Sequence, residues 1–303
     1  MNTVRLQNVK KMKKIKYIIA LFAAFSLASC TDIIELDIPE GEKLIIINGR
    51  VTDSIPVYAQ ILESAPIFSE DLNPAIQNAI VLLFEDDINV ATLTQDTTGF
   101  YRADFIGSIN KTYRLEVTVP VDHPELGNTT WASRDELLKP VAKLDSIYQE
   151  ALADNPPFVD AGEYLFYDFT ETAGLGDRLR IRYWKNDTLQ GGGSSIIAFD
   201  DEFIDGRTFT NNPNIPNALP ALQVNGSPGK DDEKWKVEHS SITKDYMKYL
   251  ELVNQQTAQT GGLFDPPPAL LEGNIYGVTN QSKTALGYFA ASALQTLEAT
   301  IKL

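Results

Sequence analysis

The sequence predicts a mostly β protein made of two β-sandwich-like domains, the second of which carries one packed α-helix. Three observations support this fold class. Short runs of alternating apolar and polar residues recur along most of the chain, which is the pattern of half-buried strands. Turn-forming residues separate these runs, and only residues 242–256 carry a long helical stripe. The 303 residues, 43% of them apolar, suffice for about two domains with buried cores.

The first domain is expected at residues 43–132, as a small β-sandwich. Asn48-Gly49 is expected to close its first strand, and the stretch from Asp96 to Gly99 has the composition of a hairpin turn. The strand order resembles that of transthyretin-like and carboxypeptidase-regulatory-like modules, because Gly99-Phe-Tyr101 fits their Gly-x-Tyr strand and Tyr113-Arg-Leu-Glu-Val117 loosely fits the next one. The expected strands are 44–48, 57–62, 79–84, 90–94, 101–105 and 113–119.

The second domain is expected at residues 138–303, after a connector over 120–140. Residues 205–231 contain prolines and Asp-Gly and Asn-Gly pairs, and are predicted to form a long irregular loop. Ser241 is predicted to cap a helix over 242–256, whose apolar stripe contains Ile242, Tyr246, Tyr249, Leu250 and Val253. The expected strands are 141–148, 163–169, 179–185, 195–199, 287–293 and 297–303.

Residues 1–29 have the organisation of a signal peptide. Basic residues cluster between Lys10 and Lys16, and a mostly apolar run extends from Tyr17 to Leu27. This run is too short for a membrane-spanning helix, which needs about 20 residues, but it fits the apolar core of an export signal. Met12 is an alternative start, because Met12-Lys-Lys-Ile-Lys is itself a complete basic region.

Leu27-Ala28-Ser29-Cys30 resembles the bacterial lipobox, which predicts lipid attachment at Cys30. A chance cysteine beside an ordinary signal peptidase site is the alternative. Residues 30–42 form an acidic segment that resembles the tethers of surface-exposed lipoproteins in Bacteroidota. Residues 1–29 hold six of the 26 basic residues and none of the 41 acidic ones, so the mature chain would carry a formal charge of −21. Such a tether would hold the folded part away from anionic membrane surfaces.

The composition argues against several classes of function. A chain this acidic repels a phosphate backbone, so we expect no nucleic-acid partner. One cysteine excludes a disulfide framework, and two histidines, His123 and His239, exclude a histidine-rich metal centre. No nucleophile motif or phosphate loop is present, since Gly191-Gly192-Gly193 is not followed by the Gly-Lys-Ser/Thr ending of a P-loop. We therefore expect neither enzymatic activity nor a cofactor.

The densest acidic cluster, with Asp200, Asp201 and Asp205, is a weak candidate for a calcium site. Aligned on Asp201, an EF-hand loop would need an oxygen ligand where Phe203 stands and a glutamate where Asn212 stands. The favoured interpretation is a solvated acidic turn, and no metal is expected.

A partner- or ligand-binding surface is the second kind of candidate site. Its candidate residues are Trp184, Phe264, Asp265 and Tyr276. Aromatic side chains on alternating strands can provide a stacking platform for a sugar or a peptide. The alternative is that they form the core and cross-strand pairs.

Several segments together resemble a family of Bacteroidota outer-membrane lipoproteins, domain-of-unknown-function family number 4249. The matching segments are Cys30-Thr-Asp-Ile-Ile-Glu-Leu-Asp37, Leu144-Asp-Ser-Ile-Tyr148, Asp200-Asp-Glu-Phe-Ile-Asp-Gly206, Ser241-Ile-Thr-Lys-Asp-Tyr246, Gly261-Gly-Leu-Phe-Asp-Pro-Pro-Pro268, Gly273-Asn-Ile-Tyr276 and Leu286-Gly-Tyr-Phe-Ala-Ala-Ser292. The resemblance defines no catalytic residues.

This resemblance implies a lipid-anchored accessory or binding protein of the outer membrane, associated with a TonB-dependent transporter and with substrate capture. The cell surface is the expected location, and the periplasmic face is the alternative. Two other functions stay open: an architectural lipoprotein of the cell envelope without a ligand, and a periplasm- or surface-facing hydrolase.

Overall fold

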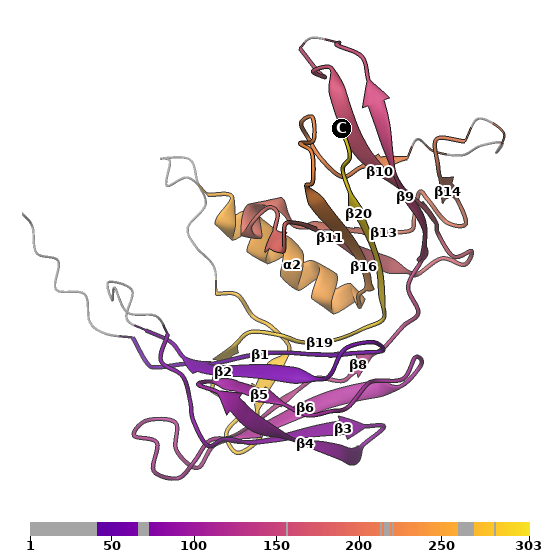
Figure 1. Cartoon of the computed structure of the whole chain (residues 1–303). Coiled ribbons are helices and arrows are strands. Elements are labelled where there is room, and N and C mark those ends of the chain that lie inside the picture. Colours follow the sequence, from indigo (N-terminus) through magenta and orange to yellow (C-terminus); the bar gives the residue numbers. More distant parts are fainter. Residues whose placement is uncertain are drawn as a thin grey trace, which may run out of the picture. The chain divides into compact units, whose positions relative to one another are not determined.

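The computed structural model describes residues 41–65, 73–155, 157–212, 214, 219, 221–259, 270–281 and 283–303. Contacts divide the chain into two units, Met1–Gly41 and Glu42–Leu303, and the second unit is described below. It is built mainly from β-strands with one α-helix, so the predicted mostly β fold class is confirmed (Figure 1).

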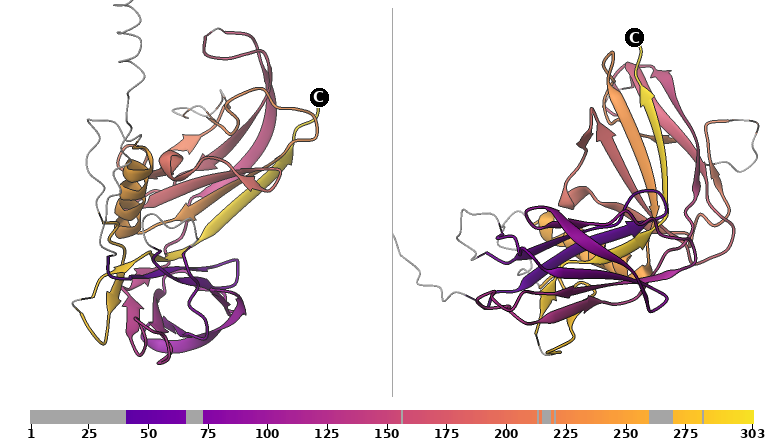
Figure 2. Two further views of the ribbon diagram at one scale, coloured as in Figure 1. Left: turned by 90° about the vertical axis from the view of Figure 1, so that its left-hand side faces the viewer. Right: turned by 60° about the horizontal axis from the view of Figure 1, so that its bottom comes forward.

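Eleven strands form the first sheet, in the order β17-β7-β6-β3-β4-β5-β2-β1-β18, with β19 beside β1 and β8 beside β6. The sheet folds over one core (Figure 2). We call the sheet together with this core the first sandwich. Its strands are β1 (Ile45–Thr52), β2 (Tyr58–Glu63), β3 (Ile80–Glu85), β4 (Ile88–Thr97), β5 (Phe100–Arg102), β6 (Thr112–Thr118), β7 (Thr130–Ser133), β8 (Glu136–Leu137), β17 (Ile275–Gly277), β18 (Ala285–Leu286) and β19 (Phe289–Ser292).

Alternation in the sequence sets the inward face of this sandwich. In β6, Tyr113, Leu115 and Val117 are buried, and the residues between them are half-buried. The hairpin between β3 and β4 turns at Asp86 and Asp87, which have φ values of 46° and 67°. Aspartate tolerates these left-handed angles better than most residues. The acidic pair is therefore a turn, as its position after an apolar run indicates.

Two local expectations differ from the structure. The strand expected to stop at Asn48-Gly49 continues to Thr52. Gly49 is needed inside this strand because a Cβ there would lie 2.9 Å from the Phe289 ring and 3.2 Å from the Tyr58 carbonyl oxygen. The connector expected over 120–140 contains β7 and β8, which pair with β6. Both strands are too short for alternation to reveal them.

The C-terminal part of the chain returns to the first sandwich. Phe289–Ser292 pairs in parallel with residues 49–52 of β1, and Ala285–Leu286 pairs in parallel with residues 45–46. β17 pairs with β7 at the other end of the sheet. The division expected from the sequence placed these strands in the 138–303 domain, so the structure differs from it here. Alternation shows that a segment is a strand but does not identify its partner.

The second sandwich consists of two smaller sheets that share one core. One sheet has the order β14-β10-β15 with β9 beside β10, and the other has the order β12-β11-β16-β20 with β13 beside β11. The strands are β9 (Lys143–Leu152), β10 (Gly162–Thr170), β11 (Arg178–Lys185), β12 (Thr188–Leu189), β13 (Ile197–Asp200), β14 (Thr208–Phe209), β15 (Leu222–Gln223), β16 (Lys234–Ser241) and β20 (Leu294–Thr300). A short 3-10 helix, η1, spans Gly193–Ser195.

His239 lies in the core of this second sandwich. Its side chain is fully buried between the rings of Tyr167 and Phe169, and Nε2 lies 3.3 Å from the Tyr167 hydroxyl. Burial lowers the pKa of His239 to about 3, because an imidazolium would lose its hydration there. His239 is thus a neutral core residue of β16.

The helix α2 spans Lys244–Thr257, and its N-cap is Thr243. Ser241, the expected cap, instead belongs to β16, and its hydroxyl donates to the Lys139 carbonyl oxygen at 2.7 Å. Two residues of the expected stripe are buried: Leu250 inside the helix, and Ile242, which precedes it. Tyr246 and Tyr249 are half-buried and pack on Tyr288, with ring centroids 4.6 and 5.1 Å away.

A buried carboxylate, Glu136 of β8, joins three separate segments. The Tyr288 hydroxyl donates to Oε1 at 2.5 Å, the Thr243 hydroxyl donates to Oε2 at 2.8 Å, and the Asn274 amide donates to Oε1 at 3.3 Å. None of these three donors is charged. Burial raises the pKa of Glu136 to about 7, although the three hydrogen bonds act in the opposite direction.

Glu136 should therefore make the stability of the chain depend on pH. Because its folded pKa lies above the ordinary value of 4.5, its stabilising contribution is complete below pH 4.5 and is lost as the pH rises through 7. A shift of this size corresponds to about 3 kcal/mol. Glu136→Gln keeps a neutral hydrogen-bonding group, so the variant should lose less unfolding free energy than the wild type between pH 5 and 8 in urea titrations.

Glu63→Gln is the matched control, because Glu63 is equally buried but pairs with Lys43 at 2.5 Å. The free energy of unfolding of Glu63→Gln, relative to that of the wild type, should not rise between pH 5 and pH 8. An unchanged pH dependence in Glu136→Gln would contradict the assignment.

Candidate functional site

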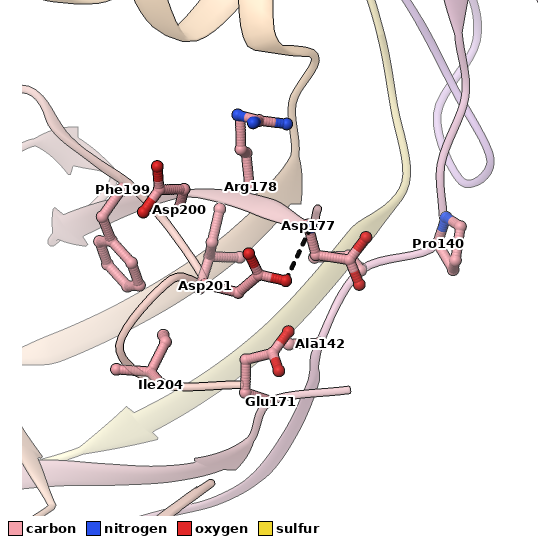
Figure 3. A pocket seen from close by; sticks show the side chains of 11 residues that line it. Pro140, Ala142, Glu171, Asp177, Arg178, Phe199, Asp200, Asp201 and Ile204 are labelled. Carbon is pink, nitrogen blue, oxygen red and sulfur yellow. Dashed lines mark hydrogen bonds between the residues drawn. The ribbon is translucent and has the colours of Figure 1, made fainter. Parts of the chain in front are cut away.

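Two loops at one end of the second sandwich are held together by carboxylates. The first loop, residues 171–177, joins β10 to β11, and the second, residues 201–207, joins β13 to β14. Asp201 is buried, and its Oδ2 accepts hydrogen bonds from the backbone N–H groups of Gly176 at 2.8 Å and Asp177 at 2.9 Å. Figure 3 shows the Asp201 carboxylate directed at Asp177, with Glu171 close by and Arg178 pointing away.

Two further carboxylates repeat this pattern between the same loops. Gly206 N–H donates to Glu171 Oε2 at 2.8 Å, and Gly174 N–H donates to Asp205 Oδ1 at 2.6 Å. Oxygens of Glu171, Asp201 and Asp205 lie within 4.8 Å of one another. Each loop therefore contributes carboxylates that bind the backbone of the other loop. We call these three residues the carboxylate staple.

The charges of the staple are balanced mainly by backbone dipoles. Burial acts to raise the pKa of Asp201, but the hydrogen bonds from Asp177 and Gly176 outweigh it, and the pKa lies below its usual value. The pKa of Glu171 is raised, first by burial and then by the negative charges of Asp177, Asp201 and Asp205. Hydrogen bonds from the backbone N–H groups thus stabilise neighbouring carboxylates that would otherwise repel one another.

The carboxylate staple contains two of the three weak candidates for a metal site. The structure brings Asp201 and Asp205 together, leaves Asp200 outside the group and adds Glu171, which the sequence analysis missed. Ca²⁺ takes six to eight oxygen ligands, whereas each carboxylate here already accepts a backbone N–H. No sequence signal links Glu171 to the cluster, because it lies 30 positions before Asp201, directly after β10. The three carboxylates therefore hold the two loops together.

The hollow beside the staple is too small for an organic ligand. Its volume is about 10 Å³, which is close to the space that one water molecule occupies. The loops instead direct two large apolar side chains outward. Leu175 is 71% exposed in the first loop, and Phe203 is 80% exposed in the second. We call Leu175 and Phe203 the apolar pair.

Of the four candidate surface residues from the sequence, the two that the structure describes lie on different sandwiches. Trp184 lies half-buried on β11 of the second sandwich, whereas Tyr276 is 40% exposed on β17 of the first sandwich. Phe264, Asp265 and Cys30 lie outside the described residues. The Trp184 ring is covered by cations, with Lys236 Nζ 4.2 Å and Arg182 Cζ 5.0 Å from its centroid.

Comparison with known families fits the fold and the sequence motifs. Residues 31–298 match the model of the family described as a domain of unknown function (DUF4249). The match covers most of the chain, so the protein belongs to this family. No curated protein matches the chain.

The carboxylate staple predicts different effects for two neighbouring aspartates. Asp201→Ala removes charge-assisted hydrogen bonds to Gly176 and Asp177, and should lower the free energy of unfolding by about 2 kcal/mol or more. Asp200→Ala is the matched control, because Asp200 accepts only a 3.4 Å hydrogen bond, from Glu202. Urea denaturation of both variants measures the difference. Equal losses would show that Asp201 does not fasten the loops.

Proposed function

We propose that the protein is a lipid-anchored accessory protein of the outer membrane that binds a TonB-dependent transporter. The observation that carries the anchor is the Leu27-Ala28-Ser29-Cys30 motif directly after an apolar run. Two or three acyl chains at Cys30 would hold the chain stably at a membrane, whereas a single chain would not. No helix in the described part of the chain is long and apolar enough to span a bilayer.

The acidic segment 30–42 has the composition of a spacer between the anchor and the folded part. Contacts divide the chain at Gly41–Glu42, and β1 starts at Ile45. The boundary therefore falls next to the end of this segment. A spacer of this kind would leave the sandwiches free to reach a partner in the same membrane.

The apolar pair supports the binding role. Exposed Leu and Phe side chains on fastened loops can enter a pocket of a partner without a large cost for ordering the loops. Acidic residues lie close to the pair in the sequence: Asp177 is half-buried, and Glu202 and Asp205 are exposed. The partner surface that fits is an apolar pocket with a basic rim. A TonB-dependent transporter is the partner that the family resemblance implies.

Lipidation is tested at Cys30. Cys30→Ala should abolish incorporation of labelled palmitate and leave an unprocessed precursor, because the acylated sulfur is gone. Ser29→Ala is the matched control, since alanine is also small and should keep the motif functional. Metabolic labelling and membrane fractionation give the answer, and unchanged labelling of Cys30→Ala would contradict the anchor.

Partner binding is tested at Phe203. The chain, extracted in mild detergent at native expression, should co-purify with an outer-membrane transporter. Phe203→Ala should weaken this complex by roughly 30-fold, which corresponds to about 2 kcal/mol for a central anchor residue. Phe158→Ala is the control, because Phe158 is 82% exposed in the loop between β9 and β10.

Two outcomes would count against this proposal. A protein recovered without any barrel would favour the architectural alternative. Equal weakening by both phenylalanine variants would remove the apolar pair from the interface.

A further inference from the structure

Three arginines meet where the two sandwiches touch, in a protein whose overall charge is strongly negative. Arg50 comes from β1 of the first sandwich, and Arg180 and Arg182 come from β11 of the second. Glu238 of β16 pairs with two of them. Arg182 donates to Glu238 Oε1 through Nε at 3.0 Å and also through Nη2, and Arg50 Nη1 lies 3.5 Å from the same oxygen. One carboxylate thus pairs with two guanidinium groups, and the third arginine, Arg180, lies on the same strand as Arg182 without a contact to Glu238.

Arg50 is largely buried but keeps N–H donors that no described residue accepts. It is 8% exposed, and a guanidinium carries five N–H donors. Among the described residues, its side chain makes one hydrogen bond, the 3.5 Å contact with Glu238. Burial and the neighbouring Arg182 lower the pKa of Arg50. None of the Arg50 nitrogens is among the fully buried atoms without a partner, so its unused N–H donors reach solvent and are open to a ligand.

The other two arginines are held in place by aromatic side chains. Arg180 Nη1 donates to the Tyr246 hydroxyl of α2 at 3.0 Å. Arg182 lies over Trp184, with Cζ 5.0 Å from the ring centroid. Its side chain is 22% exposed, so the cluster is accessible from solution. The guanidinium groups are therefore fixed before any ligand arrives.

We propose that Arg50, Arg180 and Arg182 bind the carboxylate groups of a small acidic ligand. The three arginines and Glu238 leave two positive charges, which a dicarboxylate would neutralise. A planar carboxylate also matches the paired N–H donors of a guanidinium group. This site is independent of the apolar pair and of the transporter proposed above.

The test uses the full chain in mild detergent, with succinate as the probe and constant ionic strength. Succinate should raise the melting temperature of the wild type in a saturable way, and calorimetric titration should give its affinity. Arg180→Gln should weaken binding by about tenfold or more, the equivalent of one charge-assisted hydrogen bond. Arg180 is the position of choice because its substitution leaves the Glu238 ion pairs intact.

Arg114→Gln is the matched control. Arg114 is half-buried, as Arg180 is, and lies among acidic residues of the first sandwich, so this variant should bind succinate like the wild type. If Arg180→Gln does not fold by circular dichroism, Arg180→Lys replaces it. The lysine variant keeps the charge but loses the planar fork, and should bind several-fold more weakly.

Three results would overturn the proposal. The first is the absence of saturable stabilisation of the wild type by succinate. The second is unchanged affinity in the Arg180 variant. The third is stronger stabilisation by inorganic phosphate than by succinate, which would assign the arginines to a phosphate group.

Discussion

The parallel pairing of β1 with β18 and β19 is the constraint on which the rest of the structure depends. It joins segments about 240 positions apart, as in the contact between Asn48 and Tyr288. Most of the second sandwich lies between these partners in the sequence. The chain then crosses once more, because β20 follows β19 but pairs with β16. Neither sandwich is therefore a continuous segment, and each needs the other to complete its strands.

Polar contacts join the two sandwiches where the chain passes from one to the other. Glu136 binds Thr243 at the start of α2 and Tyr288 beside β19. Ser241 donates to the Lys139 carbonyl, and Asp53 accepts from the Leu294 backbone N–H at 2.9 Å. Because unsatisfied buried polar groups are costly, separating the sandwiches would expose or orphan all of these groups together. The two sandwiches should accordingly behave as one cooperative unit.

The structural features that depend on residues adjacent in the chain could be predicted from the sequence. Alternation identified β6, β10 and β11, and the apolar stripe found α2 to within two residues at its start. Prediction from the sequence failed where a residue's role depends on a distant partner. Ser241 looks like a cap but completes a strand, and the return of β19 to β1 leaves no local trace. The mutual pairing of Glu171, Asp201 and Asp205 is equally invisible, as is the meeting of Arg50 with Arg182.

The functional features also divide into those that depend on neighbouring residues and those that depend on distant ones. The anchor at Cys30 is read from contiguous residues, whereas the apolar pair and the arginine cluster exist only once two loops or two sandwiches meet. Calorimetric unfolding of the mature chain tests the central claim, the interlocking of the sandwiches, most directly. One transition, with equal calorimetric and van't Hoff enthalpies, is the predicted result. Two separate transitions, with one sandwich melting before the other, would contradict the account.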